Sequence, residues 1–175
     1  MLHDTMNENY ATMLRTATAY ELWAANFQLS VGYEPTFASS VAPPVSLADY
    51  AARLACYNMN GTEAVMYGFV LLHRYHKLTR IPPTPLTMHR LLLAATVVAS
   101  KSHYDHFYAN AFMAKVGGVP AAELGLLELA LLQDMDFAVR LNASDLCCVA
   151  TCFLKASVNP TLDTSKCLLV TTPNG

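Results

Sequence analysis

Apolar residues recur at intervals of three and four along most of this chain, and stretches that alternate between apolar and polar residues are scarce. The first pattern is typical of helices that bury one face, whereas alternation is typical of half-buried strands. Residues 7–31 carry such a helical stripe, and Gly32 follows at a position that favours a left-handed helix end. Prolines then make residues 34–45 a loop. The sequence therefore predicts an all-α fold whose residues 1–45 form an opening helix and a proline-rich linker.

Regular helix starts follow from residue 46 onwards. Ser46 and Asp49 have the spacing of a capping box, in which side chains satisfy the free amides of a helix start. The buried face of this helix should consist of Leu47, Tyr50, Leu54 and Tyr57. The five helices predicted between residues 46 and 140 span residues 46–57, 60–78, 87–103, 107–115 and 120–136. The third is apolar on all sides between residues 91 and 99, which indicates a helix enclosed by the others.

Helix-start and helix-stop residues between these helices support the predicted boundaries. Asn60 followed by Glu63 should open the second helix, and the prolines of residues 82–85 should stop it. Gly117 and Gly118 are expected to end the fourth helix because glycine allows positive φ and close backbone approach. Pro120 suits the first position of the fifth helix. Residues 141–175 should form one extra helix to about residue 156, opened by Asn142 and Asp145, and a tail.

Composition narrows the class of protein. Hydrophobic residues make up 54% of the 175 residues and charged residues 14%, which excludes a disordered chain and favours a large core or an apolar partner surface. The net charge of −2 provides no dense cationic face for nucleic acid. The apolar runs over residues 91–100 and 146–154 are shorter than the ~18 residues of a membrane helix. The N-terminus carries the acidic residues Asp4 and Glu8, whereas a secretory signal begins with basic residues before an apolar stretch. We therefore expect an intracellular protein, in the nucleus or the cytoplasm, that binds neither nucleic acid nor membrane.

Cysteines and histidines give weak metal-site signals. The five cysteines are odd in number and irregularly spaced, so we expect reduced and mostly buried thiols. His103, Asp105 and His106 lie close together and could join cysteines in a metal site. A second paired-ligand segment of suitable spacing is missing, and so is any phosphate-cradling or nucleophile motif. No metal, cofactor or catalytic residue is therefore expected.

Several segments resemble those of a known family. Residues 86–101 resemble the third helix of a cyclin box, including the final Ala-Ser-Lys, and they open with Thr87-Met88-His89-Arg90. Residues 108–110 with 114–119, and then 124–137, are similar to the following cyclin segments. The chain thus resembles the cyclins, specifically the phosphate-response (PHO/PCL, or U/P) type, which occurs in fungi, plants and kinetoplastid protozoa. We expect a kinetoplastid source.

This resemblance implies a fold and a function. The fold would be a single five-helix cyclin box over residues 46–140 with a central buried helix, plus an N-terminal helix and one C-terminal helix. The protein would be a non-catalytic regulatory subunit that binds and activates a cyclin-dependent protein kinase, in cell-cycle or nutrient and phosphate signalling. The resemblance places Lys101 and Glu128 together at the kinase-facing surface. The other expected kinase-binding residues are Phe107, Tyr108, Phe112 and Lys115.

Other interpretations remain open at this point. Lys101 and Glu128 could form a core ion pair without a partner role, since a charge among apolar residues needs a partner in any case. Phe112 and Met88 also fit the core. At the level of function, the chain could be a cyclin-fold interaction scaffold that does not activate a kinase. A small helical enzyme or metal-binding bundle that uses His103 and its neighbours is a third hypothesis.

Overall fold

The computed structural model describes residues 2–28, 36–142, 144–147, 149 and 151. Every regular element within this part of the chain is helical, which confirms the all-α prediction. The helices are α1 (Leu2–Ala24), α2 (Leu47–Tyr57), α3 (Gly61–Thr79), α4 (Met88–His103), α5 (Asn110–Gly117) and α6 (Ala121–Asp134). A further helical turn starts at residue 144.

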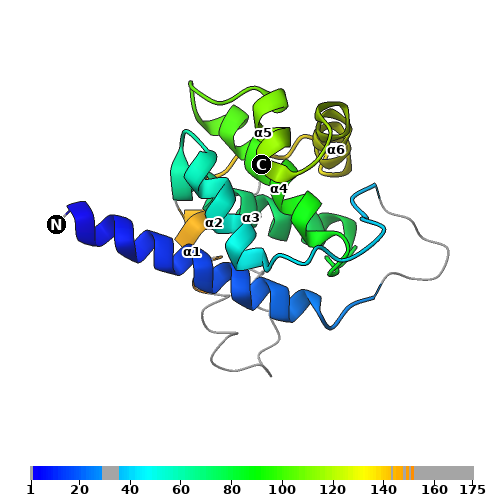
Figure 1. Ribbon diagram of the computed structural model, residues 1–175, viewed down its shortest axis with the longest axis horizontal. Coiled ribbons are helices and arrows are strands. Elements are labelled where there is room, and N and C mark those ends of the chain that lie inside the picture. Colours follow the sequence, from blue (N-terminus) through cyan, green and yellow to red (C-terminus); the bar gives the residue numbers. More distant parts are fainter. Residues whose placement is uncertain (1, 29–35, 143, 148, 150, 152–175) are drawn as a thin grey trace, which may run out of the picture.

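Helix α4 is the centre of the fold. Every residue from 91 to 100 is buried, and the helix contacts α2, α3, α5 and α6. Figure 1 shows α1 along one side of the molecule, where it packs on α2 and α3, and α5 and α6 on the opposite side. The predicted enclosed helix is therefore confirmed.

Two glycines let neighbouring helices approach α4 closely. A β-carbon on Gly68 of α3 would lie 2.5 Å from Thr96 Oγ1, and one on Gly117 would lie 2.3 Å from Leu93 Cδ2. Gly118, by contrast, has φ of 73° and forms the left-handed end of α5. The two adjacent glycines thus have separate roles, because Gly117 provides the close approach and Gly118 the positive φ.

The start of α2 agrees with its predicted capping box. The amide of Asp49 donates to Ser46 Oγ at 3.0 Å, and the expected buried residues Leu47, Tyr50 and Leu54 are buried. The prediction is wrong for the fourth residue of that face, Tyr57, because its side chain is 53% exposed. Helix α2 ends at Tyr57, where the chain changes direction and the helical period no longer decides which side chain is covered.

Helix α1 is shifted towards the N-terminus relative to its prediction. It begins at Leu2 and ends at Ala24, not at residue 31. The Asn26 amide donates to the carbonyl oxygens of Leu22 at 3.1 Å and Trp23 at 3.2 Å, so a side chain satisfies the carbonyls that another turn of helix would have used. Gly32 and the predicted continuation around it lie outside the described residues.

Other boundaries also needed correction. Helix α5 begins at Asn110 and not at residue 107, and Pro120 occupies the N-cap of α6 and not its first helical position. Helix α6 ends at Asp134 because two left-handed residues follow, with φ of 48° and 57° at positions 136 and 137. The expectation of buried thiols is wrong for the two described cysteines, Cys56 and Cys147, which are exposed.

The linker before α2 is tied to the start of α4. His89 Nε2 donates to the Val45 carbonyl at 2.9 Å, and Arg90 Nη1 donates to the Ala38 carbonyl at 2.5 Å. Arg90 also pairs with Glu123 of α6 at 2.7 Å. The Thr-Met-His-Arg segment therefore holds the linker against the helical box. We call these contacts of His89 and Arg90 the linker clamp.

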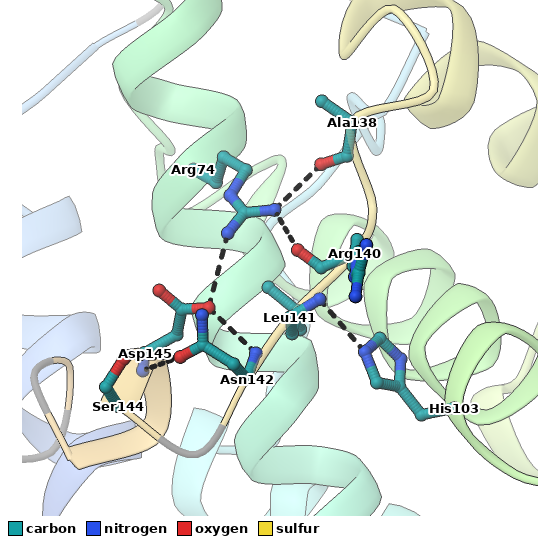
Figure 2. Close-up of polar contacts among 8 residues, drawn as sticks. All are labelled: Arg74, His103, Ala138, Arg140, Leu141, Asn142, Ser144 and Asp145. Carbon is teal, nitrogen blue, oxygen red and sulfur yellow. Dashed lines mark hydrogen bonds and ion pairs between the residues drawn. The ribbon is translucent and has the colours of Figure 1, made fainter. Parts of the chain in front are cut away.

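The segment after α6, residues 138–142, runs back across α3 and α4, and we call it the strap. Arg74 of α3 donates to the carbonyls of Ala138 at 2.9 Å and Arg140 at 2.7 Å, and it pairs with Asp145 at 3.5 Å (Figure 2). Asp145 and Asn142 exchange the hydrogen bonds of the predicted capping box. The predicted course of this last helix beyond residue 151 lies outside the described part of the chain.

Of the helices described, none is by itself both long and apolar enough to cross a membrane. Helices α5 and α6 reach that length and composition only when they are taken together, and they are bent by 98° where they meet.

Candidate functional site

Lys101 and Glu128 meet at the end of the buried helix. Lys101 lies in the last turn of α4, and its Nζ is 2.6 Å from Oε1 and 2.7 Å from Oε2 of Glu128 in the middle of α6. Both contacts have the short distances of charge-assisted hydrogen bonds. The side chains are 30% and 15% exposed, so the pair is neither sealed in the core nor fully solvated. Such a position suits contact with a partner.

Asn110 is a third member of this site that the sequence did not reveal. It is the first residue of α5, and its Nδ2 donates to Glu128 Oε2 at 2.8 Å. The Glu128 carboxylate therefore receives hydrogen bonds from α4 and α5 while it is carried by α6. Asn110 belongs to a segment that resembles cyclins, but only its spatial position shows its role. We call Lys101, Asn110 and Glu128 the polar triad.

Exposed aromatic side chains lie on α5 and on the segment that leads into it. Phe107, Tyr108 and Phe112 are 43%, 38% and 39% exposed, and the Tyr108 and Phe112 ring centroids are 4.5 Å apart. Phe112 is therefore not a core residue, whereas Met88 is buried. Leu129, directly after Glu128, is also exposed. The triad is thus accompanied by exposed apolar side chains on α6 and on the α5 segment.

Lys115 is one of the predicted site residues that the structure does not join to the polar triad. Its side chain is exposed in the last turn of α5. Within the described residues it makes no ion pair or hydrogen bond. The role of Lys115 in partner binding stays a prediction.

His103, two residues after Lys101, is used to hold the strap. Its ring stacks on Tyr67 with centroids 5.0 Å apart, and its Nε2 accepts the Leu141 amide at 3.0 Å (Figure 2). This places the ring proton on Nδ1, which faces the Ala99 carbonyl at 3.2 Å. The described residues hold no group of three or more histidine, cysteine, aspartate or glutamate side chains placed to bind a metal.

The neighbouring Tyr104 is neutral. Burial, followed by the effects of Glu63 and Tyr67, raises the pKa of its hydroxyl above the ordinary value. The segment after Lys101 therefore adds no negative charge through this tyrosine, and the Glu128 carboxylate is the acidic group that faces the Lys101 ammonium.

Comparison with known families decides the identity of the fold. The sequence model of the cyclin family matches residues 1–139 of the 175 residues. The chain belongs to the cyclin family. The match includes α1, the linker and all but the last residue of the predicted box, and every residue of the polar triad lies inside it.

Plant and fungal cyclins are similar to this cyclin. Cyclin-P3-1 of Oryza sativa subsp. japonica is 36% identical over 101 residues, which are 58% of this chain and 43% of the relative. Cyclin-U1-1 of Arabidopsis thaliana is 36% identical over 102 residues, which are 58% and 49%. The PHO85 cyclin-like protein psl1 of Schizosaccharomyces pombe is 32% identical over 114 residues, which are 63% and 46%.

These relatives confirm the phosphate-response (PHO/PCL, U/P) type. The matched part of this cyclin spans half of the relatives' own length or less. The relatives come from plants and fungi, and the kinetoplastid source stays a prediction.

Proposed function

We propose that this cyclin is the non-catalytic regulatory subunit of a cyclin-dependent protein kinase, which it binds and activates in cell-cycle or nutrient and phosphate signalling. The polar triad carries this proposal. Three helices converge on it, it is partly exposed, and it is accompanied by exposed aromatic side chains. An ion pair that served the core alone would not need this exposed apolar surround.

The triad offers both a donor and an acceptor to a partner. An ammonium has three N–H groups, and the two oxygens of Glu128 use two of those of Lys101. A carboxylate has about four acceptor positions, of which Lys101 and Asn110 use three. One donor and one acceptor remain to bind backbone groups beside the kinase C-helix, as the resemblance to cyclins implies.

The aromatic side chains would provide most of the binding energy. Interfaces depend on a few large side chains, among which tyrosine is enriched, and hydrogen bonds at the centre set orientation. Tyr108 and Phe112 already contact each other, so little side-chain freedom is lost when a partner covers them.

Activation would follow from a shift of population. A kinase is inactive while its C-helix is displaced, because the catalytic lysine–glutamate pair is then not assembled. A cyclin that binds the inward position more tightly moves the equilibrium by its difference in affinity between the two states. Such a cyclin contributes no catalytic residue, and it acts wherever its kinase is found, in the nucleus or the cytoplasm.

The test is to identify the kinase and measure its activity. The tagged full chain is purified from its source cells, bound proteins are identified by mass spectrometry, and the recovered kinase is produced separately for phosphorylation assays. We expect the wild-type chain to bind and activate it. Lys101→Ala and Glu128→Ala should abolish binding and keep the helical circular dichroism signal.

Arg15→Ala is the matched control, because Arg15 is an exposed charged residue of α1, which lies on the opposite side of the molecule from α5 (Figure 1). If both triad variants still bind, the proposed surface is wrong. If the kinase binds without any gain in activity, the interaction-scaffold alternative is supported instead.

A further inference from the structure

The turn between α2 and α3 carries two exposed apolar side chains that no contact within the fold explains. Tyr57 is 53% and Met59 is 51% exposed, and they flank Asn58, which is buried. Both types of side chain are enriched at protein interfaces.

Asparagine side chains fix this turn beside the polar triad. Asn58 Nδ2 donates to Ser100 Oγ at 3.1 Å, and Ser100 directly precedes Lys101. Asn60 Nδ2 donates to the His106 carbonyl at 3.0 Å, and His106 directly precedes Phe107.

A third bond, from the Asn60 amide to Asn58 Oδ1 at 2.9 Å, stiffens the turn itself. Figure 1 shows the α2–α3 turn next to the loop between α4 and α5. The turn is thus fastened to both ends of the segment that links the triad to the aromatic side chains.

The backbone directs the two apolar side chains outward. Asn58 is extended, with φ of −90° and ψ of 136°, and its side chain points inward to Ser100. The side chains of its two neighbours are more than half exposed and point away from the fold. Tyr57 and Met59 therefore project into solvent, where a partner can reach them.

We propose that Tyr57 and Met59 form a second part of the kinase-docking surface, continuous with the polar triad through Asn58 and Asn60. This inference rests on the proposed function. It also gives the kinase a larger contact area. A stable complex buries about 800 Å² of surface on each partner and involves roughly 20 residues a side, which is more than the triad and three aromatic side chains provide.

The occupant is the kinase and not a second copy of this chain. The turn is bonded to the residues next to Lys101 and Phe107, so a second copy seated on it would obstruct the surface that the kinase needs. The turn is also fixed by hydrogen bonds before binding, which lowers the entropy cost of docking a partner there.

The test compares two pairs of exposed apolar residues in the full chain. The variant Tyr57→Ala/Met59→Ala removes the turn side chains. The control Leu22→Ala/Leu78→Ala removes side chains that are 64% and 52% exposed on α1 and α3. Isothermal titration with the purified kinase should give at least a 10-fold higher Kd for the turn variant. The control should stay within about twofold of wild type.

Equal Kd values for the two variants would overturn the inference. Should alanine lower the thermal midpoint, the single changes Tyr57→Lys and Met59→Lys give the same comparison, because a lysine at an exposed turn leaves the fold intact. Light scattering identifies the other occupant. A wild-type dimer that becomes monomeric in the turn variant, with unchanged Kd for the kinase, would assign the turn to a second copy.

Failure of this inference differs from failure of the proposed function. If Lys101→Ala loses kinase binding and the turn variant does not, the proposed function is supported and only the role of Tyr57 and Met59 is rejected. A wild-type chain that binds no kinase at all would remove both.

Discussion

The two ends of α4 carry similar residues and are used in opposite ways. At its start, Arg90 binds a main-chain carbonyl of the linker and Glu123 of α6, and His89 is buried. At its end, Lys101 binds the Glu128 carboxylate and, among the described residues, no main-chain group. The Lys101 side chain is 30% exposed and that of Arg90 is 27% exposed, so the ends differ in what the basic residue binds and in the exposed aromatic side chains beside Lys101.

What separates the two ends is the covering chain. The linker binds His89 and Arg90 of α4 through its main-chain carbonyls, whereas the strap binds His103 and, in its described residues, does not bind Lys101. A basic residue next to an apolar helix is therefore not a site in itself. It becomes one where the main chain of its own fold leaves it a hydrogen-bonding group for a partner.

Reversal of charges at the open end should have the largest effect. Lys101→Glu or Glu128→Lys places like charges together, and we expect kinase binding to fall at least 100-fold, in the range that loss of one partner of a buried charge pair gives. The double reversal restores an ion pair but exchanges donor and acceptor, so binding should stay lost. Recovery of binding in the double variant, measured by titration calorimetry, would mean that the pair is only structural.

Removal of Asn110 should have a smaller effect at the same end. Asn110→Ala leaves the Lys101–Glu128 pair intact but frees the carboxylate from α5, and we expect about 10-fold weaker kinase binding, in line with one hydrogen bond to a charged group. Asn110→Asp adds a carboxylate beside Glu128 and should weaken binding further at pH 7. The same Kd for both variants would show that the charge at this position is unimportant.

At the closed end, a change should affect stability and not binding. Arg90→Ala removes the Ala38 hydrogen bond and the partly exposed pair with Glu123, so we expect a loss of about 1 kcal/mol in the free energy of unfolding by urea. Kinase binding should remain within twofold. The control Arg15→Ala should change neither quantity, and a large binding defect in Arg90→Ala would contradict the division between the two ends.

Acid should weaken the linker clamp. Burial lowers the pKa of His89, although its bond to Val45 and the nearby Glu21 act against this. The folded state therefore holds His89 neutral while the unfolded chain takes up a proton below about pH 6.5, so stability falls as the pH drops through that value.

Glutamine can replace the donor of His89 without titrating. In urea titrations at pH 7.5 and 5.5, His89→Gln should lose less stability on acidification than wild type, and the exposed His106→Gln should behave as wild type. A slope from about pH 6.5 down to about 4 should persist in every variant, since burial, with His76 and Lys77, lowers the pKa of His73 to about 4 in the folded state. An unchanged slope between pH 7.5 and 5.5 in His89→Gln would exclude His89 as the cause.

Local signals in the sequence predicted much of the fold. The Ser46–Asp49 box and the apolar stretch of α4 involve residues within one helix, and both are confirmed. The end of α1 failed because Asn26 competes for backbone carbonyls, which the hydrophobic period does not record.

The site was less predictable because its contacts join distant residues. Resemblance to cyclins placed Lys101 with Glu128, and the structure brings them together. Asn110 reaches across to a different helix, and the partners of Asn58 and Asn60 lie more than 40 residues away along the chain. The spacing of residues along the sequence predicts contacts within one helix, and it does not predict contacts between residues so far apart in the chain.

The Arg74 side chain holds the strap mainly through the main chain of the strap. Two of its three contacts are to main-chain oxygens, which every amino acid carries at those positions. The side chains of Ala138 and Arg140 are thus free to change with little loss of attachment, while lysine in place of Arg74 could not span the same set of oxygens. The strap keeps its course when the exposed side chains of Ala138 and Arg140 change, so these two positions can be selected for some other purpose.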